Sequence, residues 1–328
     1  MTSRSVRLFV VALGLGAFFL PCVGEAQPAK VYRVGVLSQG SAPPSGGQNF
    51  TRALHDLGYI EGRNLTLDRR WAEGKHELSS SLAAELVALK PDVIVADGTP
   101  AAIAVMRATA TIPIVMVNVS DPVGSGLVAS LARPGGNVTG GAEFGTETRV
   151  KNVELLQAVV PKATRMAVLM SDNPAHSSQL KTIQETARSM GLTILPTLVR
   201  SADDFERAFA SMTKNNAGGL IVLGGAPFVT PAQRDKLVAL AAKARLPAIY
   251  WGRFWVDAGG LLSYGSTWSQ RWGLSASYVD KILKGAKPAE LPVQQPTEFE
   301  LVINLKTAKA LGLTIPQSLL IRADDLIQ

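Results

Sequence analysis

The chain is poor in cysteine, histidine and charged residues. Its 328 residues include one cysteine, Cys22, and three histidines, His55, His76 and His176, and 18% of the residues are charged. A single cysteine excludes a disulfide framework and a cysteine-based zinc site. The histidines lie far apart and are never paired at helical spacing, which argues against a histidine-rich metal site. We therefore expect no bound metal.

The chain also lacks the patterns of disordered, fibrous and nucleic-acid-binding proteins. Hydrophobic residues make up 47% of it, and it has no collagen-like period, Gln/Asn tract or sustained heptad. The net charge is +7, but no stretch of five to eight residues concentrates Lys and Arg, so we expect no nucleic-acid partner. The length favours two domains.

The first 26 residues have the pattern of a secretory signal peptide. Arg4 and Arg7 precede an apolar run, 8–20, which is too short for a membrane span of about 20 residues. Small residues follow, and they place the cut after Ala26. Export to the periplasm removes the chain from cytosolic ATP and NAD, so we expect no cofactor. A lipid anchor at Cys22 is the alternative, although Pro21 fits a lipobox poorly.

Short apolar strands alternate with helices through the rest of the chain. The runs 92–96 and 112–117 are typical of strands in a parallel sheet that is covered on both faces. The alternation stops at a turn-rich break, 133–137, and then starts again. We predict an α/β protein with two doubly wound parallel-sheet lobes.

The restart also suggests where the lobes begin and end. We expect an N-terminal lobe of residues 31–140, completed by 264–286. The C-terminal lobe would contain residues 141–263, completed by 297–328. The chain would then cross between the lobes near 137–141, 263–266 and 288–297.

Polar loops follow the predicted strands. Ligands of such sheets bind outside the carboxyl ends of the strands, so the two lobes would share one cleft. Unpaired N–H groups where the following helices begin suit a carboxylate. Thr99 and Asp121 could instead be simple helix N-caps. The candidate ligand-binding residues are Ser38, Gly98, Thr99, Ser120, Asp121, Asp172, Asn173, Gly225 and Tyr250.

Aromatic residues gather late in the chain. The cluster of Tyr250, Trp251, Phe254 and Trp255 either stacks a flat solute or packs in the core. The pair at 268 and 272, four residues apart on a predicted helix, is expected in the core or the hinge. Trp71 ends a strand and fits either the cleft or the core.

Catalytic motifs are missing. The sequence has no Gly-X-Ser-X-Gly elbow, no phosphate-binding loop, and no Gly-X-Gly-X-X-Gly after the first strand. His176 has only Asp172 nearby as an orienting acid, so a helix-start or ligand-contact role is favoured over catalysis. The acidic pairs 203–204 and 324–325 fit a cap and a solvated tail. We expect no enzymatic activity.

Four longer motifs resemble one family. They are Leu-Ala-Arg-Pro-Gly-Gly-Asn-Val-Thr-Gly at 131–140, Asp-Pro-Val-Gly at 121–124, Gly-Gly-Leu-Leu-Ser-Tyr-Gly at 259–265, and Phe-Glu-Leu-Val-Ile-Asn-Leu-Lys-Thr-Ala at 299–308. Together they resemble the ABC-transporter substrate-binding proteins, a family that includes members binding aromatic amino acids such as tryptophan. The resemblance runs from about Val31 to the end of the chain. It implies the periplasmic-binding-protein type 1 fold and solute capture for a permease and its ATPase.

The resemblance also implies roles for single residues. Thr99 and Ser120 would hold a carboxylate, and Asp121 an ammonium group. The expected function is capture of a small polar or zwitterionic solute, amino-acid-like and aromatic in some relatives, by a monomer that meets the membrane only through its permease. A sensor subunit of the same fold remains the alternative. A repressor-like sugar binder is disfavoured because the leader takes the place of a DNA-binding headpiece, and an exported hydrolase is a more distant possibility.

Overall fold

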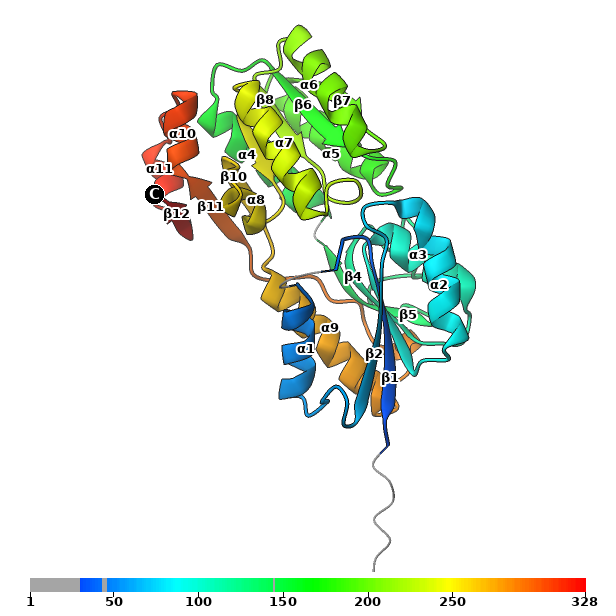
Figure 1. Ribbon diagram of the computed structural model, residues 1–328. Helices are drawn as coiled ribbons and strands as arrows, with labels where there is room; N and C mark the ends of the chain where they lie inside the picture. Colours follow the sequence, from blue (N-terminus) through cyan, green and yellow to red (C-terminus); the bar gives the residue numbers. More distant parts are fainter. Residues whose placement is uncertain (1–29, 43–45, 144) are drawn as a thin grey trace, which may run out of the picture. The chain divides into compact units, whose positions relative to one another are not determined.

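Two β-sheets organise the chain from Val31 to Gln328 (Figure 1). The structure is a computed structural model that describes residues 30–42, 46–143 and 145–328. The predicted leader and Cys22 lie outside the described residues. In those that are described, no helix has both the length and the apolar character needed to cross a membrane.

The first sheet is parallel throughout, and its described strands lie in the order β2-β1-β3-β4-β5. Their bounds are β1 Tyr32–Ser38, β2 Leu65–Trp71, β3 Val93–Asp97, β4 Ile114–Ser120 and β5 Val138–Glu143. On one face, α2 (Ser79–Ala88) and α3 (Thr99–Ala108) complete an apolar core, and on the other face α1 (Gly46–Asp56) and α9 (Trp268–Leu283) do so. We call this sheet and its four helices the first lobe.

The second sheet has the order β12-β11-β10-β9-β8-β6-β7 in the described residues. Its strands are β6 Arg165–Met170, β7 Thr193–Leu198, β8 Gly219–Val222, β9 Ala248–Tyr250, β10 Leu262–Gly265, β11 Glu300–Asn304 and β12 Asp325–Ile327. Its helices are α4 Gly145–Val159, α5 His176–Ser189, α6 Phe205–Lys214, α7 Pro231–Lys243, α8 Arg253–Asp257, α10 Leu305–Leu311 and α11 Gln317–Leu320. We call this sheet with these helices the second lobe. Helices α4, α5, α10 and α11 share one core and α6, α7 and α8 the other.

These two sheets, with helices on both faces of each, confirm the predicted α/β architecture. One strand departs from it, because β11 pairs antiparallel with β10. An extended segment leads into β11 from η3 (Pro288–Glu290), and the right-handed crossover that keeps βαβ neighbours parallel does not act there.

In the described part of the chain, the lobes are joined between β5 and α4, between β10 and α9, and between η3 and β11. The first crossing predicted, at 137–141, is wrong, because β5 stays paired with β4 as far as Glu143. The third crossing begins after Gln294, whose N–H donates to the Gly140 carbonyl of the first lobe and whose carbonyl accepts from Ala142. The lobe boundaries predicted from the sequence stay predictions.

Candidate functional site

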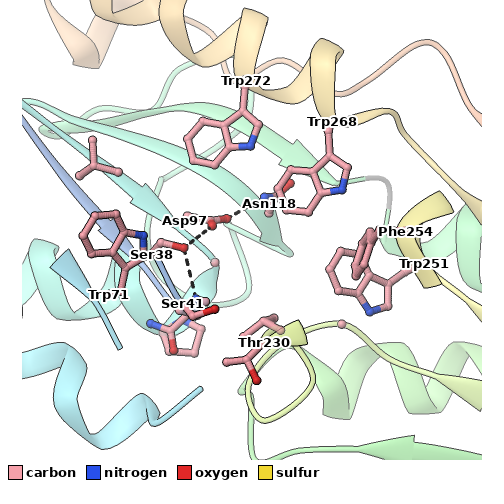
Figure 2. A pocket seen from close by; sticks show the side chains of 18 of the residues that line it. Ser38, Ser41, Trp71, Asp97, Asn118, Thr230, Trp251, Phe254, Trp268 and Trp272 are labelled. Carbon is pink, nitrogen blue, oxygen red and sulfur yellow. Dashed lines mark hydrogen bonds between the residues drawn. The ribbon is translucent and has the colours of Figure 1, made fainter. Parts of the chain in front are cut away.

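A cavity of about 340 Å³ is lined by residues of both lobes (Figure 2). This volume falls within the range of roughly 300–1,000 Å³ that small-molecule sites occupy. The first lobe supplies Ser38 and Asp97 at the carboxyl ends of β1 and β3, and the second supplies Asn173 after β6 and Gly225 after β8. The carboxyl ends of strands in two sheets therefore border one space, as the winding of the sheets predicts.

Five side chains form a continuous aromatic wall along this cavity: Phe50, Trp251, Phe254, Trp268 and Trp272. The Trp268 and Trp272 rings are nearly parallel, at 6° and 6.5 Å between centroids. Phe50 contacts Trp272 at 5.4 Å, and Phe254 contacts Trp268 at 5.7 Å and Trp251 at 4.8 Å. In Figure 2, Trp71 stands across the cavity from Trp251 and Phe254. Flat rings on opposite sides suit a flat, apolar group.

A hydrogen-bonded network of charged and polar groups lies at the first-lobe end of the cavity. Asp97 is its centre: one carboxylate oxygen accepts from Ser38 Oγ at 2.8 Å, and the other accepts from Asn118 Nδ2 at 2.6 Å (Figure 2). Arg271 Nη1 donates to Asn118 Oδ1 at 3.0 Å and lies 3.4 Å from Glu143 Oε1. The amide of Asn118 therefore links the Asp97 carboxylate to the Arg271 guanidinium.

Burial dominates the electrostatics of this network. It raises the pKa of Asp97 above its ordinary value, although the hydrogen bonds from Asn118 and Ser38 and the positive charge of Arg271 act in the opposite direction. Burial likewise lowers the pKa of Arg271, against the effect of Glu143 and Asp97. A raised carboxyl pKa means that the ionised form is incompletely compensated. A cationic group placed beside Asp97 would supply the missing compensation.

A β-bulge in β4 orients Asn118. The pairing of β4 with β5 shifts register between Met116 and Val119, and Asn118 has a φ of +54°. Opposite the bulge, Gly140 has a φ of +126°, and a Cβ there would lie 2.5 Å from the Met116 carbonyl oxygen. Only glycine fits this approach, which explains the second of the two glycine positions in the Gly-Asn-Val-Thr-Gly stretch.

Comparisons with known proteins identify the family. A family model described as "ABC transporter substrate binding protein" matches residues 41–327. This chain belongs to the ABC transporter substrate-binding protein family. A "tyrosine-binding protein" of Clostridioides difficile is 28% identical over 277 residues, which are 81% of this chain and 76% of that protein.

Solved structures agree with that assignment. A Streptococcus pneumoniae ABC domain in complex with L-Trp is 28% identical, with a TM-score of 0.84 over 91% of this chain and 100% of the other. A Vibrio cholerae conserved domain protein is 29% identical, with a TM-score of 0.85, and the match covers 90% of this chain and 100% of that protein. The predicted family and the periplasmic-binding-protein type 1 fold are confirmed.

Of the candidate ligand-binding residues in this substrate-binding protein, five line the cavity: Ser38, Gly98, Ser120, Asn173 and Gly225. The other four do not. Thr99 is 1% exposed and its hydroxyl donates to the Ser120 carbonyl, and Asp121 closes a turn by accepting from Gly124 N at 2.8 Å. Asp172 is 41% exposed and lies 3.2 Å from His76 Nε2.

Tyr250, the fourth, belongs to the core. Its ring stacks on Trp255 at 4.8 Å and 11°, and burial raises its pKa. The aromatic cluster is thus divided, because Trp251 and Phe254 line the cavity while Tyr250 and Trp255 pack behind it. Trp71, for which both settings were open, lines the cavity.

His176 supports the cavity from behind. It is 1% exposed, its Nε2 donates to the Gly224 carbonyl at 2.7 Å, and its Nδ1 accepts from Ser171 N at 3.0 Å. Burial lowers its pKa, which favours the neutral imidazole. These contacts tie the ends of β6 and β8 together and fix the Gly224–Gly225 loop, in agreement with the helix-start role favoured by the sequence.

Four residues of the charged network were not among the candidate ligand-binding residues: Asp97, Asn118, Glu143 and Arg271. Asp97 and Asn118 do stand at strand ends that were expected to line the cleft. Asp97 carried a usable signal, because an acidic residue ends an otherwise apolar strand. No sequence signal pointed to Arg271, because it lies 153 residues beyond Asn118. It stands on helix α9, which the chain reaches only after passing through the second lobe. Among the described residues, no group of three or more His, Cys, Asp or Glu side chains is arranged to hold a metal ion.

Proposed function

We propose that this protein is an exported solute-binding protein that captures an aromatic amino acid in the cavity and delivers it unchanged to an ABC importer. The observation that carries the proposal is the composition of the cavity, where an aromatic wall faces Trp71 and a buried carboxylate, Asp97, lies at one end. The relatives named for tyrosine binding and crystallised with L-Trp support the same solute class.

Different parts of the cavity suit different groups of the solute. The side-chain ring stacks between Trp71 and the aromatic wall. The ammonium group donates to Asp97, forming charge-assisted hydrogen bonds that are about twice as strong as neutral ones. The carboxylate faces hydroxyl donors, among them Ser41 and Thr230. Choline-like cations fit an aromatic cage too, but they lack the carboxylate and the flat ring.

Transport follows from closure of the two lobes. A solute that touches both lobes favours the closed state by its differential affinity, and the closed surface is what a permease with its ATPase recognises. The predicted leader, 1–26, delivers the chain to the periplasm as a monomer, and the membrane is met only through the permease. A lipid anchor at Cys22 is the alternative attachment. No chemical step on the solute is proposed.

A thermal-shift panel tests the solute class, because a ligand that binds the folded state raises the melting temperature. We expect L-tryptophan, L-tyrosine or L-phenylalanine to raise it. Indole-3-propionate, which has the ring but no ammonium, leaves it unchanged, as does choline. A rise with choline and none with aromatic amino acids would contradict the proposal. Loss of labelled amino-acid uptake on gene deletion would separate transport from sensing.

A further inference from the structure

A second, much smaller cavity lies at the hinge. Its volume is about 10 Å³, close to the space of one water molecule. Residues beside each of the three connections line it, including Glu143 and Arg149 around the first, Ser266 at the second and Phe299 at the third. Glu143 and Trp251 line both this hinge cavity and the large one, but Arg149 lines only the small one.

The hinge cavity has more positive than negative charge. Arg149 is 3% exposed and Arg271 is 8% exposed, and Glu143 is the one carboxylate among the lining residues. Glu143 is paired with Arg271, at 3.4 Å, and accepts from Ser120 Oγ at 3.1 Å. Among the lining residues, two guanidinium groups and one carboxylate leave an excess of one positive charge. The Asp97 carboxylate of the neighbouring network, which Asn118 links to Arg271, offsets the charge of Arg271.

Arg149 is the uncompensated group. Within the described residues no carboxylate lies within 4.0 Å of it, and its buried Nε has no hydrogen-bond partner. In the orientation that satisfies both ends of its amide, Asn152 accepts from Arg149 Nη1 at 3.3 Å and donates to the Thr148 carbonyl at 3.2 Å. One neutral amide does not balance a buried charge, and an arginine in a protein stays protonated.

We propose that the hinge cavity binds one small monovalent anion of the size of chloride. Arg149 and Arg271 supply the positive charge. The Ser266 hydroxyl, which already accepts from Arg271 Nε at 2.7 Å, has its proton free to donate to the anion. The small volume excludes carboxylic acids and phosphate. This inference does not depend on which solute fills the large cavity.

The test is a halide titration of the protein purified after export. Sodium gluconate is replaced by sodium bromide or sodium chloride at constant ionic strength, and the melting temperature is followed. We expect a saturable rise of a few degrees, as for a ligand roughly a hundredfold above its Kd. Arg149→Met abolishes the saturable rise. Arg63→Met, at an exposed position, keeps it.

Bromide-soaked crystals of the unaltered protein give a second measurement that does not depend on a variant folding. An anomalous peak beside Arg149 supports the proposal. A water only at that position, or a rise of the same size in Arg149→Met, overturns it. If Arg149→Met fails to fold, Arg149→Lys keeps a positive charge but loses the guanidinium fork, and a weaker halide dependence is expected there.

Discussion

The two lobes contribute unlike surfaces to the same cavity. The first lobe brings the charged network around Asp97 and Arg271, together with Trp71 and the Trp268–Trp272 stack on α9. The second lobe brings Trp251, Phe254 and backbone-rich loops such as Gly224–Gly225, and its lining has no carboxylate. The comparison indicates that the first lobe is the recognition surface, held by its own hydrogen bonds, and that the second lobe is a cover with two aromatic rings and the polar side chains of Asn173, Thr230 and Arg234.

The largest effect should come from the backbone that shapes the first-lobe surface. Gly140→Ala should lower the free energy of unfolding by about 3 kcal/mol or more, because the new Cβ meets the Met116 backbone in a strained conformation. Gly136→Ala, in the same motif, has nothing within 4 Å and should change stability little. Urea unfolding measures both. Equal losses in the two variants would show that the bulge is not the constraint.

The next largest effect should come from the carboxylate of the network. Asp97→Asn should weaken affinity for an aromatic amino acid about 100-fold or more, since breaking a buried pair costs about 3–5 kcal/mol. Asp203→Asn, at an exposed position of the second lobe, is the matched control. Calorimetric titration measures the affinities. If Asp97→Asn changed the affinity by less than threefold, the first lobe would not be the recognition surface.

The pH dependence of affinity and stability also tests the role of the Asp97 carboxylate. The ammonium group needs an ionised Asp97, and burial raises the pKa of that carboxyl. Affinity should therefore be full above the raised pKa and fall as the pH drops through it, by up to tenfold per unit. The fall should begin at a higher pH than an ordinary aspartate would give. For the unliganded protein the sign is opposite: between the ordinary and raised pKa values, stability falls as pH rises. Titrations from pH 7.5 to 4.5 measure both trends.

The aromatic side chains of the second-lobe cover should matter less. Phe254→Ala should weaken affinity about tenfold by removing ring contact and apolar burial on the second-lobe side. Trp255→Leu removes a buried ring of the same helix that does not line the cavity, so it should lower stability and leave affinity nearly unchanged. If both variants lost affinity equally, the cover would act through its fold rather than through contact with the solute.

The smallest effect should come from an interlobe contact between His76 Nε2 and Asp172 at 3.2 Å, which is an ion pair only when the histidine is protonated. The two side chains are 37% and 41% exposed, and such pairs contribute about 0–1 kcal/mol. Asp172→Asn should therefore weaken affinity by at most about fivefold, chiefly through faster release measured by stopped flow. A hundredfold loss of affinity would show that the second lobe also recognises the solute, which the residues lining its side of the cavity do not suggest.

The sequence predicted the fold better than the site because periodicity is local and the network is not. Short apolar strands between helices were enough to place polar loops at strand ends, and five of nine candidates do line the cavity. Strand β9 has three residues, too few for alternation to separate Tyr250 from Trp251. The bulge that turns Asn118 and the return of α9 with Arg271 depend on pairings across the fold, which no spacing in the sequence encodes.

Calorimetric titration of the exported protein with L-tryptophan and L-tyrosine tests the central claim most directly. The account predicts saturable binding of one molecule per chain for at least one of them, with the amino acid recovered unchanged. An absence of saturable heat with every aromatic amino acid, or recovery of a chemically altered solute, would contradict it.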